Sequence, residues 1–600
     1  MIKKIKYTLL ASIVAVALMG CEDKFLTQSN PNAITDMTFW KSESDFEKAV
    51  NALYGSLQLP SVSGTEFLTN EPLRSDLAGT ESWYTAQLVF DKLRWDDANS
   101  YVASRWSELY VGVYRANQIL YHLPDAEGII EADELKLIEG HAKFIRGYCY
   151  FMLANSYNGA VIVNELPTNA EKMHKPFSPR AEVISTMVIP DLTDAKSILP
   201  KKWDASGLGK ATWGAATAML GKTYLYDKKW SEAGAQFAEI INSELYSLVP
   251  KFMDNFTTDN EFNSESVFEV SFSDSFKPGT SPSQHDEIDG SEATGIAQAY
   301  ASITGGGGFN TVLPSYCIQE MFVAADQMDP SNKWTSSHER SIRTYSTIVV
   351  EYGDGDYYKA PLTEYTDADG NIVASKANFS YGQGSKIKKW TQWDRVEAEN
   401  SSNGCRTGIN YRAIRYSDIL LMYAEALLEQ GKTSDAIPYV DKVRSRAGVI
   451  TLSKYMEDNG GKIPQLHISS FANNRTDVVA MTSQYNFVEA SAENLLTHIR
   501  RVERVLEFAY EGHRWYDLVR WGIAKEVFDQ GWEEEQKLKL YFNTNADGNF
   551  PSDVVTVKEY PLFLNQRIRP DFELASNNYK PDVHDYFPIP SIETENNNAL

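Results

Sequence analysis

Apolar residues recur at intervals of three and four along several stretches of this chain. The spacing predicts amphipathic helices over residues 105–123 and 135–157, each with one apolar face that packs on a neighbour. Ser42 and Asp45 stand three positions apart, as in a capping box, so another helix is predicted from Ser42 to about Leu57. A helical scaffold is therefore expected over about residues 41–250.

Two segments, residues 210–245 and 417–445, carry the pattern of a tetratricopeptide helix pair. Small residues at fixed positions allow two antiparallel helices to approach closely, and larger residues fill the groove to the next pair. Ala233 and Ala436 hold equivalent positions in the two segments and are 203 residues apart (436 − 233). The pattern predicts a mainly α, tetratricopeptide-like scaffold that resumes over about residues 410–530 after a long insertion.

The region of about residues 255–410 differs in composition from the helical parts. It contains the glycine run Gly305–Gly308, a β-favouring stretch from Tyr345 to Tyr352, and Asp369-Gly370, which is typical of a two-residue hairpin turn. We expect a large irregular insert of loops and short strands here. A strong helix is predicted between Ala492 and Phe528, and an irregular segment over residues 530–600.

Residues 1–40 read as an export signal followed by a tether. Lysines at positions 3, 4 and 6 precede the uncharged stretch Tyr7–Met19, which is shorter than the roughly 20 residues that span a bilayer. Leu18-Met19-Gly20-Cys21 looks like a bacterial lipobox, so residues 1–20 are expected to be a lipoprotein signal peptide and Cys21 the acylated residue. Residues 21–40 would then be the lipidated tether; a signal peptide with an incidental cysteine is the alternative.

Charge limits the possible partners. The chain has 57 Lys and Arg against 81 Asp and Glu, a net charge of −24, which becomes −27 once the three lysines of residues 1–20 are removed. Such a chain repels phosphate backbones and anionic head groups, so nucleic-acid binding and a basic membrane-surface role are disfavoured, and neutral ligands are favoured over acidic ones. The 43% of hydrophobic residues favours large folded cores over disorder.

No sequence motif of a cofactor or metal enzyme is present. H-E-x-x-H, G-x-S-x-G and G-x-G-x-x-G are missing, and the nine histidines are scattered. Asn543-x-Asn545-x-Asp547-Gly548 resembles the opening of a calcium loop, but Val554 stands where the bidentate glutamate belongs, so a turn is favoured. We expect no cofactor and no metal. Cys149, Cys317 and Cys405 are expected to be buried free thiols, with one disulfide left open.

Aromatic residues in irregular, polar stretches are the candidate ligand-binding residues. A sugar ring stacks its C–H face on an aromatic ring while charged and amide side chains bind its hydroxyls; the alternative for each ring is packing beneath its own loop. The candidate rings are Trp83, Tyr84, Trp95, Tyr300, Phe309, Trp334, Trp390 and Trp393. Arg74, Asp76 and Glu81 are the expected hydroxyl partners.

Three long motifs in the C-terminal half closely resemble the SusD/RagB family: residues 412–426, 443–448 and 503–522. Residues 142–157 and Phe587-Pro588-Ile589-Pro590 are also similar to the family's sequences. In residues 503–522, charges of opposite sign alternate at intervals of three and four, which predicts ion pairs within one helix beside an apolar face. The motifs therefore indicate residues that build the helical scaffold more than residues that form a binding site.

The resemblance implies a single SusD-like body over residues 41–600, on a lipoprotein of the outer membrane that faces the cell exterior. It also implies a protein that captures glycans without cleaving them and acts with a SusC-like TonB-dependent transporter. Two alternatives remain: peptide capture, as in the RagB-like branch, and a surface glycan hydrolase, whose paired carboxylates leave no short sequence mark. Neither the glycan and its linkage nor the partner transporter is specified.

Overall fold

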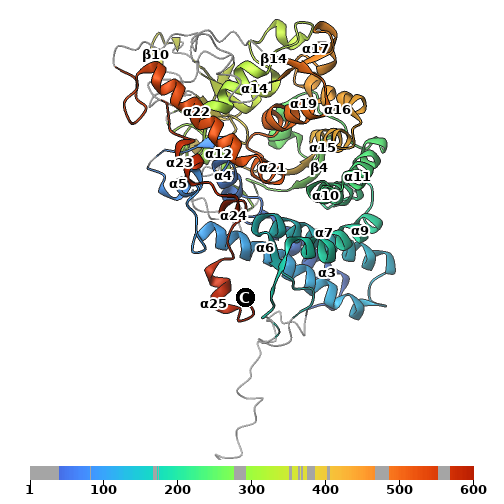
Figure 1. Ribbon diagram of the computed structural model, residues 1–600. Helices are drawn as coiled ribbons and strands as arrows, with labels where there is room; N and C mark the ends of the chain where they lie inside the picture. The colour runs from blue at the N-terminus through green and yellow to red at the C-terminus, as the bar shows by residue number, and fades with distance from the viewer. Residues whose placement is uncertain are drawn as a thin grey trace, which may run out of the picture.

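Helices from the first part of the chain form the lower half of the molecule in Figure 1. In this computed structural model they are α3 (Glu43–Gly55), α6 (Ser100–His122), α7 (Ala132–Tyr157) and α9 (Ile189–Ile198). The Ser42 N–H donates to Asp45 Oδ2 at 3.1 Å, so the predicted capping box is present at the start of α3. The three predicted helices are confirmed, and α6 and α7 begin somewhat earlier than expected.

The structure describes residues 39–600 with several gaps. Cys21 and Cys405 lie outside the described residues, as do the signal peptide and almost all of the expected tether. The gaps are residues 82, 167–171, 173, 276–291, 304, 351–354, 363–364, 367–368, 374–384, 402–405, 466–485 and 552–567.

The two tetratricopeptide-like helix pairs are α10 (Trp213–Tyr226) with α11 (Trp230–Asn242), and α15 (Tyr416–Glu429) with α16 (Thr433–Arg446). A Cβ at Gly221 would lie 2.6 Å from the Phe237 ring, which shows how closely α10 and α11 approach. α11 packs against α15, so the two pairs lie side by side in space (Figure 1). The predicted helical scaffold is confirmed.

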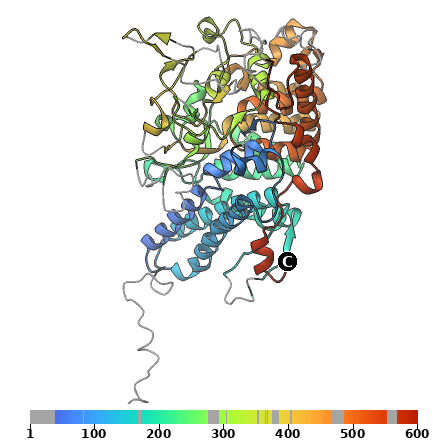
Figure 2. The same ribbon diagram turned by 90° about the vertical axis from the view of Figure 1, so that its left-hand side faces the viewer.

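The insertion leaves and rejoins the scaffold at one place. β4 (Ser266–Val270) and β12 (Tyr411–Arg415) pair antiparallel at its two ends, with Tyr411 opposite Val270. Figure 2 shows the green and yellow segments between them spread over one side of the molecule as loops and short elements. The helices between these strands are short: α12 (Ile296–Tyr300), α13 (Tyr316–Glu320) and α14 (Ile342–Thr347).

Every other sheet among the described residues also has two antiparallel strands. The pairs are β1 (Ala78–Gly79) with β5 (Leu313–Pro314), β2 (Gly159–Val161) with β3 (Phe177–Pro179), β6 (Ile348–Val350) with β11 (Ser385–Ile387), β7 (Asp356–Tyr357) with β8 (Ala360–Pro361), β9 (Tyr365–Thr366) with β10 (Ile372–Val373), and β13 (Lys462–Gln465) with β14 (Asn486–Glu489). The predicted hairpin at Asp369-Gly370 corresponds to β9–β10, but β9 ends at Thr366 and β10 begins only at Ile372, so the connection is longer than the predicted two residues.

The single helix predicted between Ala492 and Phe528 is wrong. α19 (Ala492–His498) continues through a π-helical turn into α20 (Arg504–Phe508), and the chain then leaves the helix before α21 (Arg514–Trp521). Tyr510 and Gly512 adopt positive φ angles of 65° and 80°, and a Cβ at Gly512 would lie 2.5 Å from the Phe67 ring. The close approach of α4 (Thr65–Leu73), which carries Phe67, therefore requires a glycine at this break, which periodicity does not reveal.

The C-terminal segment is more helical than expected. α22 (Ala524–Phe542) extends into the region predicted to be irregular, and three short helices follow it: α23 (Glu573–Asn578), α24 (Pro581–His584) and α25 (Ser591–Asn596). Within α22, a Cβ at Gly531 would lie 2.6 Å from Phe572, just before α23. Packing of the chain end onto α22 thus accounts for the additional helix.

Most charges of residues 503–522 pair with other elements, which corrects the prediction of ion pairs within one helix. The buried Arg415 of β12 donates to Glu507 at 3.0 Å and to Glu511 at 2.9 Å. Arg504 pairs with Asp418 of α15 at 2.6 Å. Asp517 and Arg520, 2.8 Å apart, form a pair within α21. These charges therefore join the insertion's ends to the helical scaffold.

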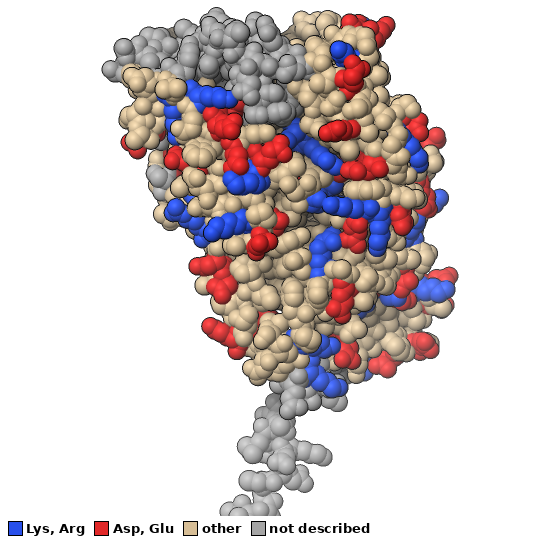
Figure 3. Space-filling model, viewed as in Figure 1, with Lys and Arg blue, Asp and Glu red and all other residues tan. Residues whose placement is uncertain are grey.

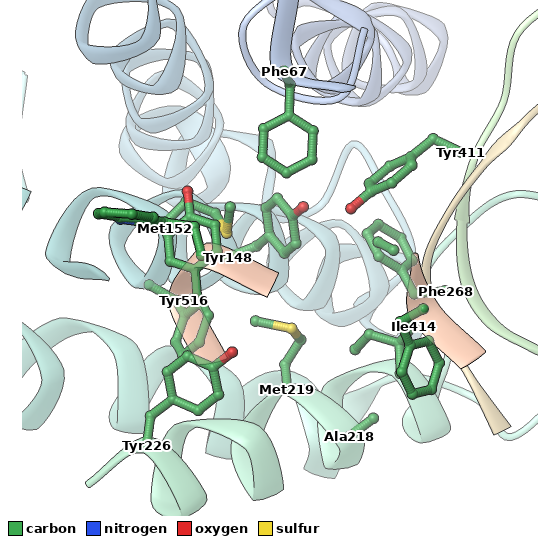
Figure 4. Close-up of a cluster of buried hydrophobic side chains, with 14 of the residues drawn as sticks. Phe67, Tyr148, Met152, Ala218, Met219, Tyr226, Phe268, Tyr411, Ile414 and Tyr516 are labelled. Atoms are coloured by element: carbon green, nitrogen blue, oxygen red, sulfur yellow. The ribbon is translucent and has the colours of Figure 1, made fainter. Parts of the chain in front are cut away.

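Apolar side chains from both halves of the chain meet in one core. In Figure 4, Phe67 of α4, Tyr148 of α7, Met219 of α10 and Tyr411 of β12 point toward a common centre. Cys149 and Cys317 are buried free thiols, as predicted, and burial raises the pKa of both. Among the described helices, none combines the length and apolar character needed to cross a membrane.

Candidate functional site

The pairing of β1 with β5 brings two distant loops together. Ala78 lies opposite Pro314 and Gly79 opposite Leu313, so the residues that follow β1 run beside the residues that precede β5. The Thr80 hydroxyl donates to the Thr311 carbonyl at 2.6 Å. The segment before α5 (Thr85–Asp91) is thereby held against the end of the loop that contains Gly305–Gly308, which we call the glycine-rich loop.

Trp83, Tyr84 and Phe309 form an aromatic patch at this junction, and we call these three residues the aromatic patch. Trp83 is 55% exposed and Phe309 is 39% exposed. The Trp83 and Tyr84 ring centroids are 6.0 Å apart, and the half-buried Tyr84 donates its hydroxyl hydrogen to the Phe309 carbonyl. Burial, followed by the nearby Glu81 carboxylate, raises the pKa of Tyr84, so its hydroxyl stays protonated and able to donate at neutral pH.

The glycine-rich loop that carries Phe309 is fixed by its own backbone. The Phe309 N–H donates to the Gln298 carbonyl at 2.7 Å, and the Gly308 N–H donates to the Ser302 carbonyl at 3.0 Å. A Cβ at Gly308 would lie 2.5 Å from the Ala301 carbonyl oxygen, so this position has no room for a side chain. The exposed Phe309 ring thus projects from a tightly folded turn.

Glu399 stabilises the same loop through hydrogen bonds. Its N–H donates to the Gly306 carbonyl at 2.9 Å, while its carboxylate accepts from the Gln392 N–H at 2.6 Å and the Tyr358 hydroxyl at 2.8 Å. Burial raises the pKa of Glu399 to about 7. Sequence reasoning missed this residue, because an isolated glutamate in a polar stretch carries no signal of burial.

Four of the predicted ring residues are buried. The Trp390 indole N–H donates to the Tyr510 carbonyl at 2.8 Å, and the Tyr300 hydroxyl donates to the Leu68 carbonyl. Trp95 packs with its ring 5.5 Å from that of Phe587 and 6.0 Å from that of Trp515, and Trp393 lies in a small separate core with Tyr357 and Tyr358. The expectation that these rings face a ligand is wrong, because other segments cover them.

The three predicted hydroxyl partners are buried as well. Arg74 pairs with Glu71 at 2.8 Å and lies over the Phe587 ring at 4.1 Å. Asp76 accepts two hydrogen bonds of 2.7 Å from Arg514. Glu81 is buried, and its carbonyl accepts from the Tyr84 N–H at 3.0 Å. These charges hold the segment from α4 to β1 in place instead of facing solvent, which corrects their predicted role.

Trp334 belongs to a different aromatic cluster. Its half-buried indole stacks on His338, with ring centroids 3.4 Å apart and planes at 5°, and its ring N–H donates to the Arg340 carbonyl at 2.6 Å. Tyr345 meets it edge-on at 5.2 Å. One face of Trp334 is therefore occupied by the protein itself.

Among the residues that the structure describes, no cluster of three or more His, Cys, Asp or Glu side chains has the arrangement of a metal site. Asn545 Oδ1 accepts from the N–H groups of Asp547 and Asn549 at 3.0 and 2.9 Å, so the predicted turn is confirmed. In Figure 3, Lys and Arg are interspersed with Asp and Glu over the face in view.

The best-supported candidate site is the aromatic patch. Ile303, which is exposed on the same glycine-rich loop, is a neighbouring residue that sequence reasoning missed.

Comparisons with known proteins agree with this architecture. The model described as "SusD family" matches residues 264–600, and the one described as "Starch-binding associating with outer membrane" matches residues 24–225. SusD-like protein P2 of Formosa agariphila is 24% identical over 566 residues, covering 91% of this chain and 96% of that protein.

Solved structures show the same fold. A SusD superfamily protein from Bacteroides vulgatus matches 93% of this chain and 98% of its own at 23% identity, with a TM-score of 0.67. A laminarin-binding SusD-like protein matches 93% of this chain and 98% of its own at 20% identity, with a TM-score of 0.63. Because one family model covers more than half of its length, this chain belongs to the SusD family.

Proposed function

We propose that this protein is a non-catalytic, cell-surface glycan-binding lipoprotein. It captures an oligosaccharide or polysaccharide at the aromatic patch and delivers it to a SusC-like TonB-dependent transporter of the outer membrane. The observation that carries the proposal is the pair of exposed rings, Trp83 and Phe309, contributed by segments 226 positions apart (309 − 83) and locked together through Tyr84.

The chemistry of this patch suits a sugar ring. Trp83 and Phe309 offer apolar surface to the C–H groups of a pyranose at little cost in loop ordering, because the loops that carry them are already hydrogen-bonded. The likeness to a laminarin-binding protein supports a carbohydrate ligand, and the family description supports association with the outer membrane. Under this proposal Cys21 carries the lipid and residues 22–40 tether the body of residues 41–600.

The decisive experiment measures binding and cleavage together. Purified mature protein is titrated by calorimetry with a panel of neutral polysaccharides that begins with laminarin, and with peptide mixtures as the competing class. The recovered glycan is then assayed for new reducing ends. Saturable glycan binding without shortening is expected.

Two outcomes would replace the proposal. Peptide binding in place of glycan binding would assign the RagB-like function. New reducing ends, lost when one Asp or Glu is replaced, would assign a glycan hydrolase. Transport is tested separately, by co-purification of a TonB-dependent transporter from detergent-solubilised outer membranes with the lipidated protein.

A further inference from the structure

Two pockets adjoin on the surface where the loop before α10 meets α3 and β4. They have volumes of about 570 and 460 Å³ and share Leu208, Gly209, Lys210 and Glu269 in their linings. Each falls in the size range of ordinary small-ligand sites. We call the two together the groove; the aromatic-patch residues do not line it.

The loop that forms the groove is rigidly built. Asp204 accepts from the N–H groups of Ser206 and Gly207 at 3.0 and 3.2 Å, and the Trp203 indole N–H donates to the Ala211 carbonyl at 2.9 Å. The Ala211 N–H donates to the Tyr54 hydroxyl of α3 at 2.8 Å. The loop is therefore tied to the scaffold, so a ligand would meet a preformed surface.

One wall of the groove is aromatic. Phe262 holds a positive φ of 52°, which is unfavourable for a residue with a side chain, and its N–H donates to the buried Glu269 carboxylate at 3.1 Å. Its ring lies over Gly209, where a Cβ would be 3.5 Å away. Tyr246 stands nearby with its hydroxyl 3.2 Å from that of Thr212. Both rings are half-buried, so part of each faces the groove.

The basic residues of the groove have no acidic partner within the part of the chain that the structure describes. Arg115 lines one pocket, Lys201 and Lys202 line the other, and Lys210 lines both. None of the four is within ion-pair distance of a described carboxylate, although Lys201 and Lys210 lie 5.3 and 5.6 Å from the rings of Trp213 and Trp203. Arg115 donates to the Ala52 carbonyl, and no described carboxylate pairs with any of the four, so they place positive charge around one groove in a chain of net charge −24.

Most acidic residues of the groove have a hydrogen-bond or ion-pair partner within the protein. Glu269 is buried and accepts from Asn410 at 2.8 Å, and Arg412 lies 3.4 Å from it. Glu292 accepts from Gln58 at 2.6 Å. Glu244 is exposed at the rim, and Asp204, near Lys210, is bonded to its own loop. With Glu269 paired to Arg412, the linings hold four cations against the carboxylates of Glu244 and Glu292, which is an excess of positive charge.

We propose that the groove is a second binding site, which takes an anionic saccharide. Carboxylate or sulfate groups of the ligand pair with Lys201, Lys202, Lys210 and Arg115, and a sugar face packs on Phe262 and Tyr246. Cations beside ring faces suit a charged sugar better than a free inorganic anion, because an inorganic anion would leave the aromatic wall unused. The saccharide class rests on the function proposed above, whereas the site and its charge do not.

The test compares matched variants by calorimetry at low ionic strength. The probes are hexagalacturonate, a sulfated galactan hexasaccharide, the neutral laminarihexaose and sodium sulfate. The groove variant is K201Q/K202Q/K210Q. The control variant, K41Q/K136Q/K251Q, makes the same change in net charge at exposed lysines outside the groove. Thermal unfolding confirms that each variant is folded.

The wild-type protein and the control variant should bind an anionic hexasaccharide equally. The groove variant should bind it at least tenfold more weakly and leave laminarihexaose binding unchanged, and added salt should weaken only the anionic binding. Equal losses in both triple variants, or no loss in the groove variant, would overturn the proposal. So would competition by sodium sulfate as strong as that by hexagalacturonate, since the site would then serve a free anion.

The two proposals fail in different ways. If laminarihexaose binds and is lost in W83A, while no anionic probe depends on the groove, the groove proposal falls and the glycan-binding function stands. If only anionic probes bind, and only through the groove, the role of the aromatic patch falls and the groove proposal stands. No glycan binding at either place would refute both.

Discussion

The Tyr84 hydroxyl donates to the Phe309 carbonyl, a hydrogen bond that joins residues 225 positions apart. It ties the segment before α5 to the glycine-rich loop and so sets the relative position of the two exposed rings. Y84F removes this bond and keeps the ring. We expect about 1 kcal/mol less stability and a roughly fivefold weaker glycan affinity, measured by denaturant unfolding and calorimetry. Unchanged affinity would show that the two loops hold their positions without this bond.

W83A and F309A should each weaken glycan binding without unfolding the protein. Truncating a stacked ring at a binding hot spot typically costs about 2 kcal/mol of binding free energy, which is roughly thirtyfold in affinity. The matched control is W390A, which removes a fully buried ring and should cost about 3–5 kcal/mol of unfolding free energy. Full affinity in both patch variants would contradict the assignment of the site.

G308A should disturb the patch through the backbone. A Cβ at Gly308 would lie 2.5 Å from the Ala301 carbonyl oxygen and 2.6 Å from that of Gln298, so the loop must shift at a cost of about 1–3 kcal/mol, and glycan affinity should fall. G55A is the control, since a Cβ there lies 3.8 Å from Gln58 at the end of α3. That variant should be neutral or slightly stabilising in thermal unfolding. Equal affinities for the two variants would show that the loop tolerates a side chain.

E399Q should stabilise the protein more at high pH than at low pH. Because burial raises the pKa of Glu399 to about 7, above its unfolded value near ~4.3, the wild type loses stability as pH rises through this interval. Glutamine carries no charge, and it keeps the Oε1 that accepts from Gln392 and Tyr358. The advantage of E399Q over wild type should grow by about 2 kcal/mol between roughly pH 5 and 8.

E511Q is the counterpart with the opposite sign. Burial opposes ionisation of Glu511, yet Arg415 and Lys389 outweigh burial and lower its pKa. Its stabilising contribution is therefore present above the unfolded pKa and is lost as pH falls through the lower, folded pKa. E511Q should cost about 3–5 kcal/mol at neutral pH, with a smaller deficit in acid. Parallel pH profiles for E399Q and E511Q would refute at least one of the two assignments, and the sign of the common slope would show which.

C21S tests the anchor. If Cys21 is acylated and becomes the mature N-terminus, the variant should be found soluble or unprocessed in cell fractionation, because the lipid chains that hold the body to the membrane are missing. A variant that stays in the membrane fraction with its signal removed would contradict the lipoprotein prediction.

Local periodicity predicted several of the long helices, because each amphipathic helix carries its own pattern within a dozen residues. α3, α6, α7 and the two tetratricopeptide-like pairs were predictable in this way. The break after α20 was not, since it contains Gly512 at a positive φ beside the Phe67 ring, a neighbour from a distant segment. The ion pairs of residues 503–522 were misassigned for a related reason: charge spacing shows which residues share a helix face and not which residues cover that face.

The sequence by itself also selected aromatic residues outside the helical patterns as candidates, and Trp83 and Phe309 were among them. Only the tertiary structure decided which rings face solvent. Trp95 is covered by Phe587 and Trp515, and Trp390 by Tyr510, from parts of the chain more than 100 positions away. Trp83 and Phe309 remain exposed where the β1–β5 pairing brings their two segments together. Burial depends on which distant segments pack together, and no short stretch of sequence records that.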